Sequence, residues 1–506
     1  MSGTDPMMEG MRLWAWNATP QRVMGKIPNT LAVSALTALV TGFLFLRVQT
    51  IEPIFTLGLL AIAIFAAISV YSPLTGLLSL TGIIILLEDI PTHAQKIKHG
   101  EFHPFYRLHL PLAHFTALEL MLLVLVVVVI IRSQDHEAFL PKSRFIVPLV
   151  AFMGCAIGGV IYSALLGTYS FLDYDSPATI AINEFRPLSY VPLVCWLFYK
   201  IVRSQKQLRL FVETVGGLLL IRAVMGVFRY FMGIGFLEEF GVRIFLGDEL
   251  FFFVSAILFM TARLQYAHMN IASAFLLGIG LTLMGFCLLF SFVREWEVGV
   301  LFGLGLLFFR WTPQAQSRTK YWAILLSLGG ALVIWTSLLQ MDSSQAWHAW
   351  KYHSFDYWQQ SYSFQYRWIE TKNAIRTWWE NPLFGVGMGG RWQLYEYLPR
   401  LYRQTNTHNF YAFILLHLGV TGFAIFAWFF RQVGQEIDAL RVLTAHRQMP
   451  ENEALLGGTA VSLQTLALVC ITGPSPTFSR SAIWIGLLLG ILAALRRIEG
   501  SLCRQR

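Results

Sequence analysis

The chain has 506 residues, of which 56% are hydrophobic and only 13% are charged. Because a soluble domain carries about 25% charged residues, this composition excludes an ordinary soluble protein and indicates an integral membrane protein. The net charge of +9 comes largely from basic residues in short loops between apolar runs, which is a signature of membrane topology. We therefore expect no nucleic-acid partner.

The apolar runs predict the membrane-spanning helices. Residues 1–29 are polar and basic and lack the features of a cleavable signal, so we expect the first apolar run to be a retained span. A spanning helix requires about 20 mostly apolar residues, and such runs begin near residues 30, 54, 74, 112, 145, 188, 209, 248, 271, 297, 322, 408, 455 and 481. Only Tyr71, Ser72 and Pro73 separate the runs at 54 and 74, which are either two spans or one bent hairpin. We expect an all-α polytopic membrane protein with about 12–14 transmembrane helices.

Basic residues predict the orientation of these spans. One set of alternate loops is rich in them, for example the loop with Arg132, Lys142 and Arg144, and the other set is poor. This asymmetry predicts that both termini are cytoplasmic. The predicted organisation is a cytoplasmic tail at 1–29, transmembrane helices 1–11 at 30–339, a large external loop at 340–407, transmembrane helices 12–14 at 408–496 and a cytoplasmic tail at 497–506.

The external loop at 340–407 is much longer than the other connections, and loops of that length are usually functional or disordered. Its composition argues against disorder, because disordered segments are poor in aromatic residues. Seven of the sixteen tryptophans lie there: Trp347, Trp350, Trp358, Trp368, Trp378, Trp379 and Trp392. These side chains either form a belt at the membrane surface or line a wall for a sugar or lipid ligand.

Within this loop, residues 366–380 are predicted to be helical, because apolar and aromatic residues recur at helical spacing from Trp368 to Trp378. Asn381-Pro382 ends the helix, since the residue before a proline avoids the helical region. Four glycines in 385–390 follow and allow a tight turn with a close backbone approach.

His408 lies at the outer end of the apolar run that begins there, next to Asn409. An imidazole titrates near neutral pH, so it can act as a base or as a hydrogen-bond donor. The alternative is an interfacial histidine beside a helix cap formed by Asn406 or Thr407.

Two arginines are expected on the same outer face as His408. Arg294 lies in a short turn between two spans, and Arg367 opens the loop helix. Each has a local partner that would make it structural, namely Glu295 or Glu297 for Arg294 and Glu370, three residues on, for Arg367. Arginine also suits a diphosphate, because it presents five donors in a fork and a permanent charge. The convergence of the three residues on one face predicts a site.

Arg222 lies in the middle of an apolar run. A charge there costs at least about 2.5–3.5 kcal/mol. It is either paired, with Glu119 as the candidate partner, or it lines a polar cavity that leads to the external site. Arg229 lies two helical turns further out on a similar face and would extend that lining.

Other chemistry is not indicated. The GVGMGG run is no phosphate-binding P-loop, because no Lys-Ser or Lys-Thr follows it. His348 and His353 lie near Asp356, but nothing completes a metal set. None of the five cysteines forms a pair in an external loop, so we expect neither a disulfide framework nor a thiolate metal site. We expect no metal and no cofactor.

The run RWIETKNAIRTWWENPLFGVGMGG, followed by THNFYAFILLHLGVTGF, resembles the core of the bacterial O-antigen ligase and O-antigen polymerase family. The resemblance rests on Arg367, on the NPL-x-GVG-x-G turn at 381–389, on His408-Asn409 and on the glycines at 419–422. A weaker resemblance extends over residues 145–490.

Three positions depart from the family pattern. Arg294 falls where the family carries an arginine in a short outer turn, but it lacks the usual serine and glycine beside it. The sequence GDEL occupies 247–250, where many members have a Pro-Asn, and His417 stands where an acidic residue is usual.

The resemblance implies a metal-independent, inverting membrane glycosyltransferase with a GT-C-like fold. The donor would be a glycan on undecaprenyl diphosphate at the periplasmic face of the bacterial inner membrane, so the external loop would be periplasmic. Arg294 and Arg367 would bind the diphosphate, and His408 would orient or deprotonate the acceptor hydroxyl. The GVGMGG turn would let the loop backbone close over the site. The substrate-binding residues that we predict are Asn409, Gly385, Gly387, Arg222, Arg229 and Trp368.

Several alternatives stay open. The acceptor would be lipid A–core in lipopolysaccharide synthesis, another lipid-linked repeat in polysaccharide polymerisation, or a protein, as in a protein O-oligosaccharyltransferase. From a different class, a transporter or flippase of lipid-linked sugars would also have many spans and intramembrane charges such as Arg222.

Overall fold

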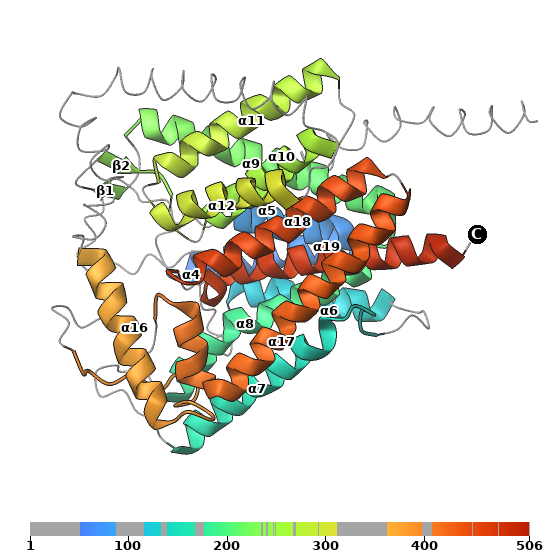
Figure 1. Cartoon of the computed structure of the whole chain (residues 1–506). Coiled ribbons are helices and arrows are strands. Elements are labelled where there is room, and N and C mark those ends of the chain that lie inside the picture. The colour runs from blue at the N-terminus through green and yellow to red at the C-terminus, as the bar shows by residue number, and fades with distance from the viewer. Residues whose placement is uncertain are drawn as a thin grey trace, which may run out of the picture. The chain divides into compact units, whose positions relative to one another are not determined.

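The computed structural model is helical through most of the residues that it describes (Figure 1). The described ranges are 51–87, 116–132, 139–166, 177–233, 236–238, 241–245, 247, 249–266, 270–291, 293–310, 362–396, 407–447, 449–473 and 475–504. The chain divides into two compact units, one formed by 1–89, 101–134 and 204–222, and the other by 90–100, 135–203 and 223–506.

The first unit contains a helical hairpin. Helices α4 (Ile51–Tyr71) and α5 (Pro73–Leu86) pack against each other and against α6 (Ala117–Arg132). The Ser72 hydroxyl between α4 and α5 accepts a hydrogen bond from the Thr75 amide at 3.2 Å, and a proline stands in the first turn of α5. A serine cap followed by proline is a strong start signal for a new helix. The runs near 54 and 74 are therefore two helices.

Helix α6 begins with a capping box. The Thr116 amide donates to a Glu119 carboxylate oxygen at 2.6 Å, and the Glu119 amide donates to the Thr116 hydroxyl at 3.2 Å. Glu119 therefore lies in the first turn of α6 and not in the middle of that helix. Arg222 lies on α9 (Gln205–Phe231) and is the last residue of that helix that belongs to the first unit. It is 3% exposed, and its Nη1 donates to the Leu86 carbonyl at 3.4 Å.

The second unit holds the end of α9 and most of the remaining elements. Its helices are α7 (Ile146–Leu166), α8 (Pro177–Ile201), α10 (Leu250–Tyr266), α11 (Ile271–Leu289), α12 (Arg294–Arg310), α16 (Tyr362–Glu380), α17 (Phe410–Arg447), α18 (Pro450–Val469), the 3-10 turn η2 (Ser475–Thr477) and α19 (Ser479–Arg504). A two-stranded antiparallel hairpin, β1 (Phe236–Glu238) with β2 (Gly241–Arg243), sets Leu237 opposite Val242.

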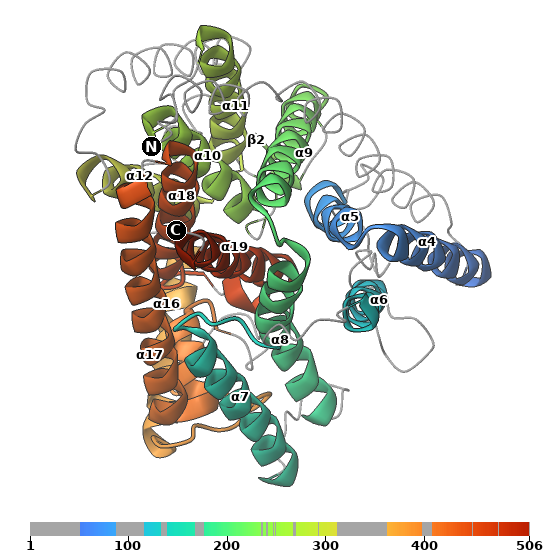
Figure 2. The same ribbon diagram turned by 90° about the vertical axis from the view of Figure 1, so that its right-hand side faces the viewer.

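Helix α19 lies at the centre of this unit and packs on α8 and α18 (Figure 2). Its buried Arg480 forms an ion pair with Glu249, which directly precedes α10, and both side chains are almost fully buried. Mutual attraction offsets part of the cost of removing two opposite charges from water. The GDEL run at 247–250 thus supplies a buried counter-ion to the last helix.

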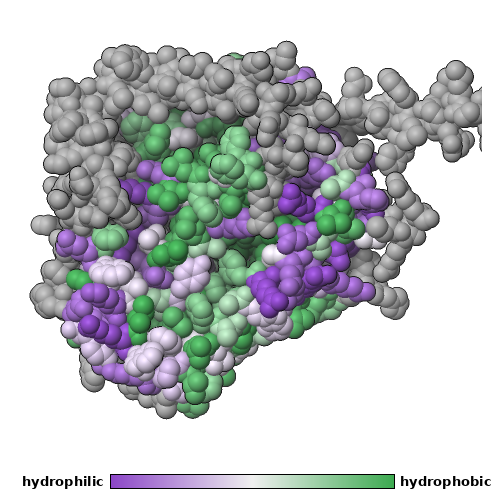
Figure 3. Space-filling model, viewed as in Figure 1, coloured by the Kyte–Doolittle hydropathy of each residue, from purple (hydrophilic) through white to green (hydrophobic). Residues whose placement is uncertain are grey.

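The membrane character of the chain shows in the helices and on the surface. Five of the described helices are long and apolar enough to cross a membrane: Ile146–Leu165, Gln205–Phe231, Ala272–Leu289, Phe410–Arg447 and Ser479–Gly500. Large apolar side chains such as Phe275, Leu301 and Phe309 are exposed. Figure 3 shows apolar residues across the middle of one face, between hydrophilic side chains around α16 and around the C-terminal half of α17.

The all-α polytopic fold is as predicted, and each expected span within the described ranges meets a helix. Helix α8 differs most, because it begins at Pro177, well before the predicted start near 188, and continues through Pro187 and Pro192. The expected spans near 30 and 322 lie outside the described residues.

Candidate active site

Helix α16 carries the residues predicted for the loop helix. It covers the expected 366–380 and starts slightly earlier, at Tyr362, and it ends before Asn381-Pro382. Its inner face packs on the start of α17 through a buried apolar cluster that includes Tyr366, Ala374, Ala412 and Leu416. This packing fixes the position of α16 relative to the segment that contains His408.

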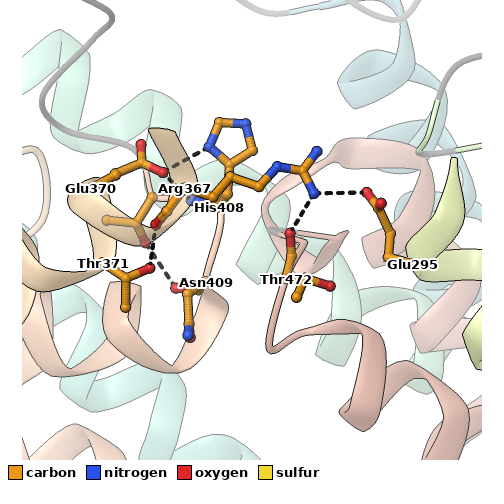
Figure 4. Close-up of polar contacts among 8 residues, drawn as sticks. Glu295, Arg367, Glu370, Thr371, His408, Asn409 and Thr472 are labelled. Atoms are coloured by element: carbon orange, nitrogen blue, oxygen red, sulfur yellow. Dashed lines mark hydrogen bonds and ion pairs between the residues drawn. The ribbon is translucent and has the colours of Figure 1, made fainter. Parts of the chain in front are cut away.

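His408 is held by a buried carboxylate. Its ring Nδ1 lies 2.8 Å from Oε2 of Glu370, and its backbone amide donates to the same oxygen at 2.9 Å (Figure 4). The Glu370 side chain is 2% exposed, whereas the His408 side chain is 38% exposed. The ring of Tyr366 stands edge-on to the imidazole, with 6.0 Å between ring centroids. The outer part of the imidazole is therefore the part that solvent or a substrate can reach.

Arg367 lies one helical turn before Glu370 and points to other partners. Its Nη1 donates to the Thr472 carbonyl at 3.0 Å and lies 3.3 Å from Glu295 Oε1 at the start of α12 (Figure 4). The local pair of Arg367 with Glu370 considered from the sequence is not the one that forms, because Glu370 binds His408. Glu295, one of the two local partners considered for Arg294, binds Arg367.

The candidate site therefore joins four chain segments, one of which is the segment after α18 that supplies the Thr472 carbonyl. Helix α16 supplies Arg367 and Glu370, the segment before α17 supplies His408, and the start of α12 supplies Glu295 with the adjacent, half-buried Arg294. We call these residues, with the Thr472 carbonyl, the His408 cluster. The three residues predicted to converge, Arg294, Arg367 and His408, all belong to it or adjoin it in the chain.

Asn409 caps the helix that follows. Its side-chain oxygen accepts a hydrogen bond from the Ala412 amide at 3.0 Å, and the Thr407 hydroxyl donates to its carbonyl at 2.8 Å. His408 thus does sit beside a helix cap, but the capping side chain is that of Asn409 and not Asn406 or Thr407. The Oδ1 of Asn409 is therefore already hydrogen-bonded to the backbone of α17. The predicted contact of Asn409 with a substrate stays a prediction.

The glycine-rich turn is inserted into a break in α17. Gly419 interrupts that helix with φ of 63° and ψ of −166°. The freed backbone groups pair with the turn: the Val386 amide donates to the Leu416 carbonyl at 2.7 Å, and the Val420 amide donates to the Pro382 carbonyl at 2.8 Å. We call residues 381–390 the wedge.

The wedge also packs on the other two neighbouring helices. The Met388 amide donates to the Gly159 carbonyl on α7 at 3.1 Å, and the Gly389 amide donates to Glu184 on α8 at 2.7 Å. His417, which stands where the family usually has an acid, donates from Nδ1 to the Gly387 carbonyl at 2.8 Å. Its Nε2 lies 3.7 Å from Glu184 Oε2. His417 on α17 and Glu184 on α8 thus both form hydrogen bonds with the backbone of the wedge.

Two glycines of the wedge were predicted to bind substrate. Both have positive φ, 68° at Gly385 and 84° at Gly387. A Cβ on Gly385 would lie 2.3 Å from the Leu416 carbonyl oxygen, and one on Gly387 would lie 2.9 Å from the Ser163 side chain. Close backbone approach is confirmed, but the partners are helices α17 and α7. The expectation that this turn closes over the site is therefore wrong, because the turn is buried between helices.

The remaining predicted residues are not members of the His408 cluster. Arg222 and Arg229 lie far from it in the chain, and Trp368 directly follows Arg367 on α16. Arg222 belongs to the first unit. Arg229, near the end of α9, is buried, with its guanidinium 5.7 Å from the centre of the Phe245 ring. Trp368 is exposed on α16 with the Lys372 ammonium 5.7 Å from its ring centre, so it is available to a ligand at the surface.

An apolar chamber between helices adjoins the His408 cluster. Its volume is about 60 Å³, and it is bounded by α7, α8, α17, α18 and α19 with side chains such as Phe152, Val191, Leu463 and Ile485. Phe410 and Cys470 form part of its wall and share a backbone hydrogen bond of 2.9 Å. His408 lies two residues before Phe410, and Thr472 lies two residues after Cys470, so the chamber begins beside the polar cluster.

The helices that are long and apolar enough to cross a membrane define a polytopic membrane protein. The His408 cluster is its candidate active site. Residues 279–427 match the model of a family described as O-antigen ligase. This match confirms the resemblance of the chain to the O-antigen ligase and O-antigen polymerase family. The matched residues include Arg294, Arg367 and His408 but neither Arg222 nor Arg229. No curated protein matches the chain.

Two features of the site are absent from the sequence predictions. Glu370 was considered only as a neighbour of Arg367, because helical spacing indicates partners within one turn and not a residue in a later segment. Glu184 lies in a polar interruption of an apolar run, IAINEF, which is the signal that could have indicated a buried hydrogen-bonding role. Among the described residues, no three His, Cys, Asp or Glu side chains gather as a metal site would require.

Proposed function

We propose that the protein is a membrane glycosyltransferase that moves a glycan from undecaprenyl diphosphate to an acceptor hydroxyl at the periplasmic face of the bacterial inner membrane. The match to the O-antigen ligase family supports glycosyl transfer in general. The observation that carries the proposal is the His408 cluster, in which an oriented, partly exposed imidazole is held by the same helix that carries a guanidinium with donors to spare.

Arg367 suits the leaving diphosphate. Its Nη1 is oriented by Thr472 and Glu295, and its buried Nε makes no hydrogen bond to any described residue. Donors held in place before the reaction stabilise the negative charge that develops on the leaving group. Arg294, at the N-terminus of α12, would add a second positive charge there, and helix N-termini also favour anions.

His408 would act as the base. The acceptor oxygen attacks the anomeric carbon as the bond from that carbon to the diphosphate oxygen breaks. The hydroxyl proton passes to the imidazole, and undecaprenyl diphosphate leaves as an anion. A single displacement of this kind inverts the anomeric configuration. General base catalysis by a positioned side chain contributes about 10²–10⁴-fold in rate, and none of these steps calls for a metal.

The apolar chamber would take the part of the isoprenoid chain nearest the diphosphate. Its lining is almost wholly apolar, and it begins beside the polar cluster. An amphiphilic donor could therefore place its charged group against Arg367 and its chain among the helices. This arrangement explains a base that stands at the mouth of an apolar helix.

The membrane organisation that we propose follows from this site. The loop at 340–407 with α16 would be periplasmic, and the tails at 1–29 and 497–506 cytoplasmic. The acceptor would be lipid A–core, a growing polysaccharide or a protein, since nothing in the His408 cluster favours one of them. Trp368, Arg229 and Arg222 remain proposed contacts of the glycan or lipid.

Donor turnover by the purified protein tests the proposal. The wild type in nanodiscs, given the lipid-linked glycan, candidate acceptors and EDTA, should release undecaprenyl diphosphate. His408→Ala should be about 10²–10⁴-fold slower. His446→Ala, the same exchange at the exposed far end of α17, is the matched control and should retain the wild-type rate.

Two results would contradict the proposal. Equal rates for His408→Ala and His446→Ala would remove the base from the mechanism. If the wild type releases nothing with any acceptor while lipid-linked glycan crosses liposome membranes, the protein is a transporter, a class that the buried Arg222 on α9 also suits. Loss of activity in EDTA alone would overturn metal independence.

A further inference from the structure

The carboxylate behind His408 has no part in the reaction as described so far. Glu370 lies on α16, its side chain is 2% exposed, and one of its oxygens contacts His408 twice. A buried carboxylate is costly unless it is hydrogen-bonded, and here the two hydrogen bonds that this oxygen accepts both come from the one residue that we assign as the base. This concentration of contacts points to a role in positioning.

We propose that Glu370 is a positioning residue that fixes His408 as the Nδ1–H tautomer and leaves Nε2 as the only nitrogen that can accept a proton. The inference rests on the proposed function, because it concerns how the same site prepares its base. A carboxylate can only accept hydrogen bonds. Nδ1, 2.8 Å from Glu370 Oε2, must therefore carry a hydrogen. In a neutral imidazole, the lone pair is then on Nε2.

The contacts also fix the direction of the ring. The amide of His408 and its Nδ1 share one oxygen of Glu370, at 2.9 and 2.8 Å, so the ring cannot turn about its bond to the backbone without losing a hydrogen bond. The edge of Tyr366 restricts the ring from another side. With Nδ1 turned to the protein interior, Nε2 lies on the exposed side of the ring, and it makes no hydrogen bond to any described residue.

Helix α16 gives this arrangement a second consequence. Glu370 and Arg367 are three residues apart and therefore lie on the same face of one rigid element. The group that orients the base and the group that binds the diphosphate thus keep a fixed spacing. A shift of α16 would displace both together, so the base would be correctly oriented only when the guanidinium is also in place.

The tautomer can be observed directly in the wild type. Histidine labelled with ¹⁵N in both ring positions would be examined by magnetic resonance in nanodiscs at alkaline pH, where the imidazole is neutral. The His408 signal would be assigned by its absence in His408→Ala. We expect the hydrogen on Nδ1. A hydrogen on Nε2 would overturn the inference, and this readout does not depend on turnover.

Kinetics of Glu370→Gln provide the second test. The amide has nearly the same size but can present an N–H to Nδ1, which favours the other tautomer. We expect kcat to fall about 10²-fold or more, with the donor KM unchanged within a factor of about two. Glu380→Gln, the same exchange at the exposed end of α16 where the side chain contacts Gln393 and Tyr395, should keep both constants.

The outcomes separate this inference from the proposed function. If the wild type and Glu380→Gln turn over and His408→Ala does not, but Glu370→Gln keeps the wild-type kcat, only the role of Glu370 is overturned. A parallel loss of kcat and of thermal stability in Glu370→Gln, with the hydrogen on Nε2 in the wild type, also overturns it. If the wild type itself is inactive with every acceptor, the proposed function fails and the role of Glu370 falls with it.

Discussion

At the scale of single residues, the guanidinium of Arg367 provides hydrogen-bond geometry as well as a positive charge. Arg367 uses Nη1 for two partners and keeps its other nitrogens for a ligand. Arg367→Lys keeps the charge but loses the planar fork that binds a diphosphate through two parallel hydrogen bonds. We expect kcat/KM for the lipid-linked donor to fall about 10-fold or more, measured as initial rates of undecaprenyl diphosphate release.

A matched control lies on the same helix. Arg376→Lys makes the same exchange at an exposed arginine that pairs with Glu396 and lies over the Tyr395 ring. It should retain the wild-type kcat/KM, because surface ion pairs contribute little. If the two variants behave alike, Arg367 does not bind the diphosphate through its fork.

The residue types of the site could be found from the sequence, but their partners could not. Arg294, Arg367 and His408 stand out by motif and by expected face. The contacts that organise them join residues 38 apart, from His408 to Glu370, and 72 apart, from Arg367 to Glu295. Local rules for helices predict pairs within one turn. Tertiary packing overrode the pairs of Arg367 with Glu370 and of Arg294 with Glu295.

At the scale of elements, the break in α17 holds the wedge in place. Gly419 has φ of 63°, and a Cβ there would lie 2.4 Å from the carbonyl of Leu383. Gly419→Ala would therefore combine backbone strain with a clash against backbone atoms. We expect a loss of about 2 kcal/mol or more in the free energy of unfolding, seen as a lower midpoint of thermal unfolding in detergent.

The same helix offers the control for this prediction. Gly434 has a helical conformation, and a Cβ there would meet nothing within 4 Å. Gly434→Ala should leave stability unchanged or raise it by up to about 1 kcal/mol. An equal or larger loss at Gly434 would show that the wedge does not depend on the break.

The sequence predicted elements better than it predicted their docking. The helix at 366–380 and the tight glycine turn both exist, because spacing and glycine conformations are local properties. The direction in which the turn packs depends on α7 and α8, which lie more than two hundred residues earlier in the chain. No local pattern specifies that choice, so closure over the site was a natural expectation and a wrong one.

At the scale of the whole molecule, the prediction to test is orientation. Composition alone indicates the membrane class, and the alternation of basic and non-basic loops predicts cytoplasmic termini. Single cysteines in a background without the five natural ones would report the side. Glu380→Cys, at the exposed end of α16, should react with a membrane-impermeant maleimide in cells with a permeabilised outer membrane.

The complementary position is Glu451, exposed in the first turn of α18. Glu451→Cys should react only after the inner membrane is also opened, because the loop between α17 and α18 is expected to be cytoplasmic. Labelling of Glu451→Cys in cells with an intact inner membrane would reverse the proposed topology and place the His408 cluster on the wrong side for a periplasmic donor.

The insertion of the wedge into α17 has a consequence for biosynthesis. The ribosome synthesises α7 and α8 early and the Leu416–Thr421 segment late. Residues 381–390 form hydrogen bonds with all three. The wedge can therefore dock only after α17 has left the translocation machinery, and α16 acquires its fixed place at the same moment. The cluster around His408 is thus assembled near the end of synthesis, and a nascent chain stopped before His408 has Arg367 but no base to accompany it.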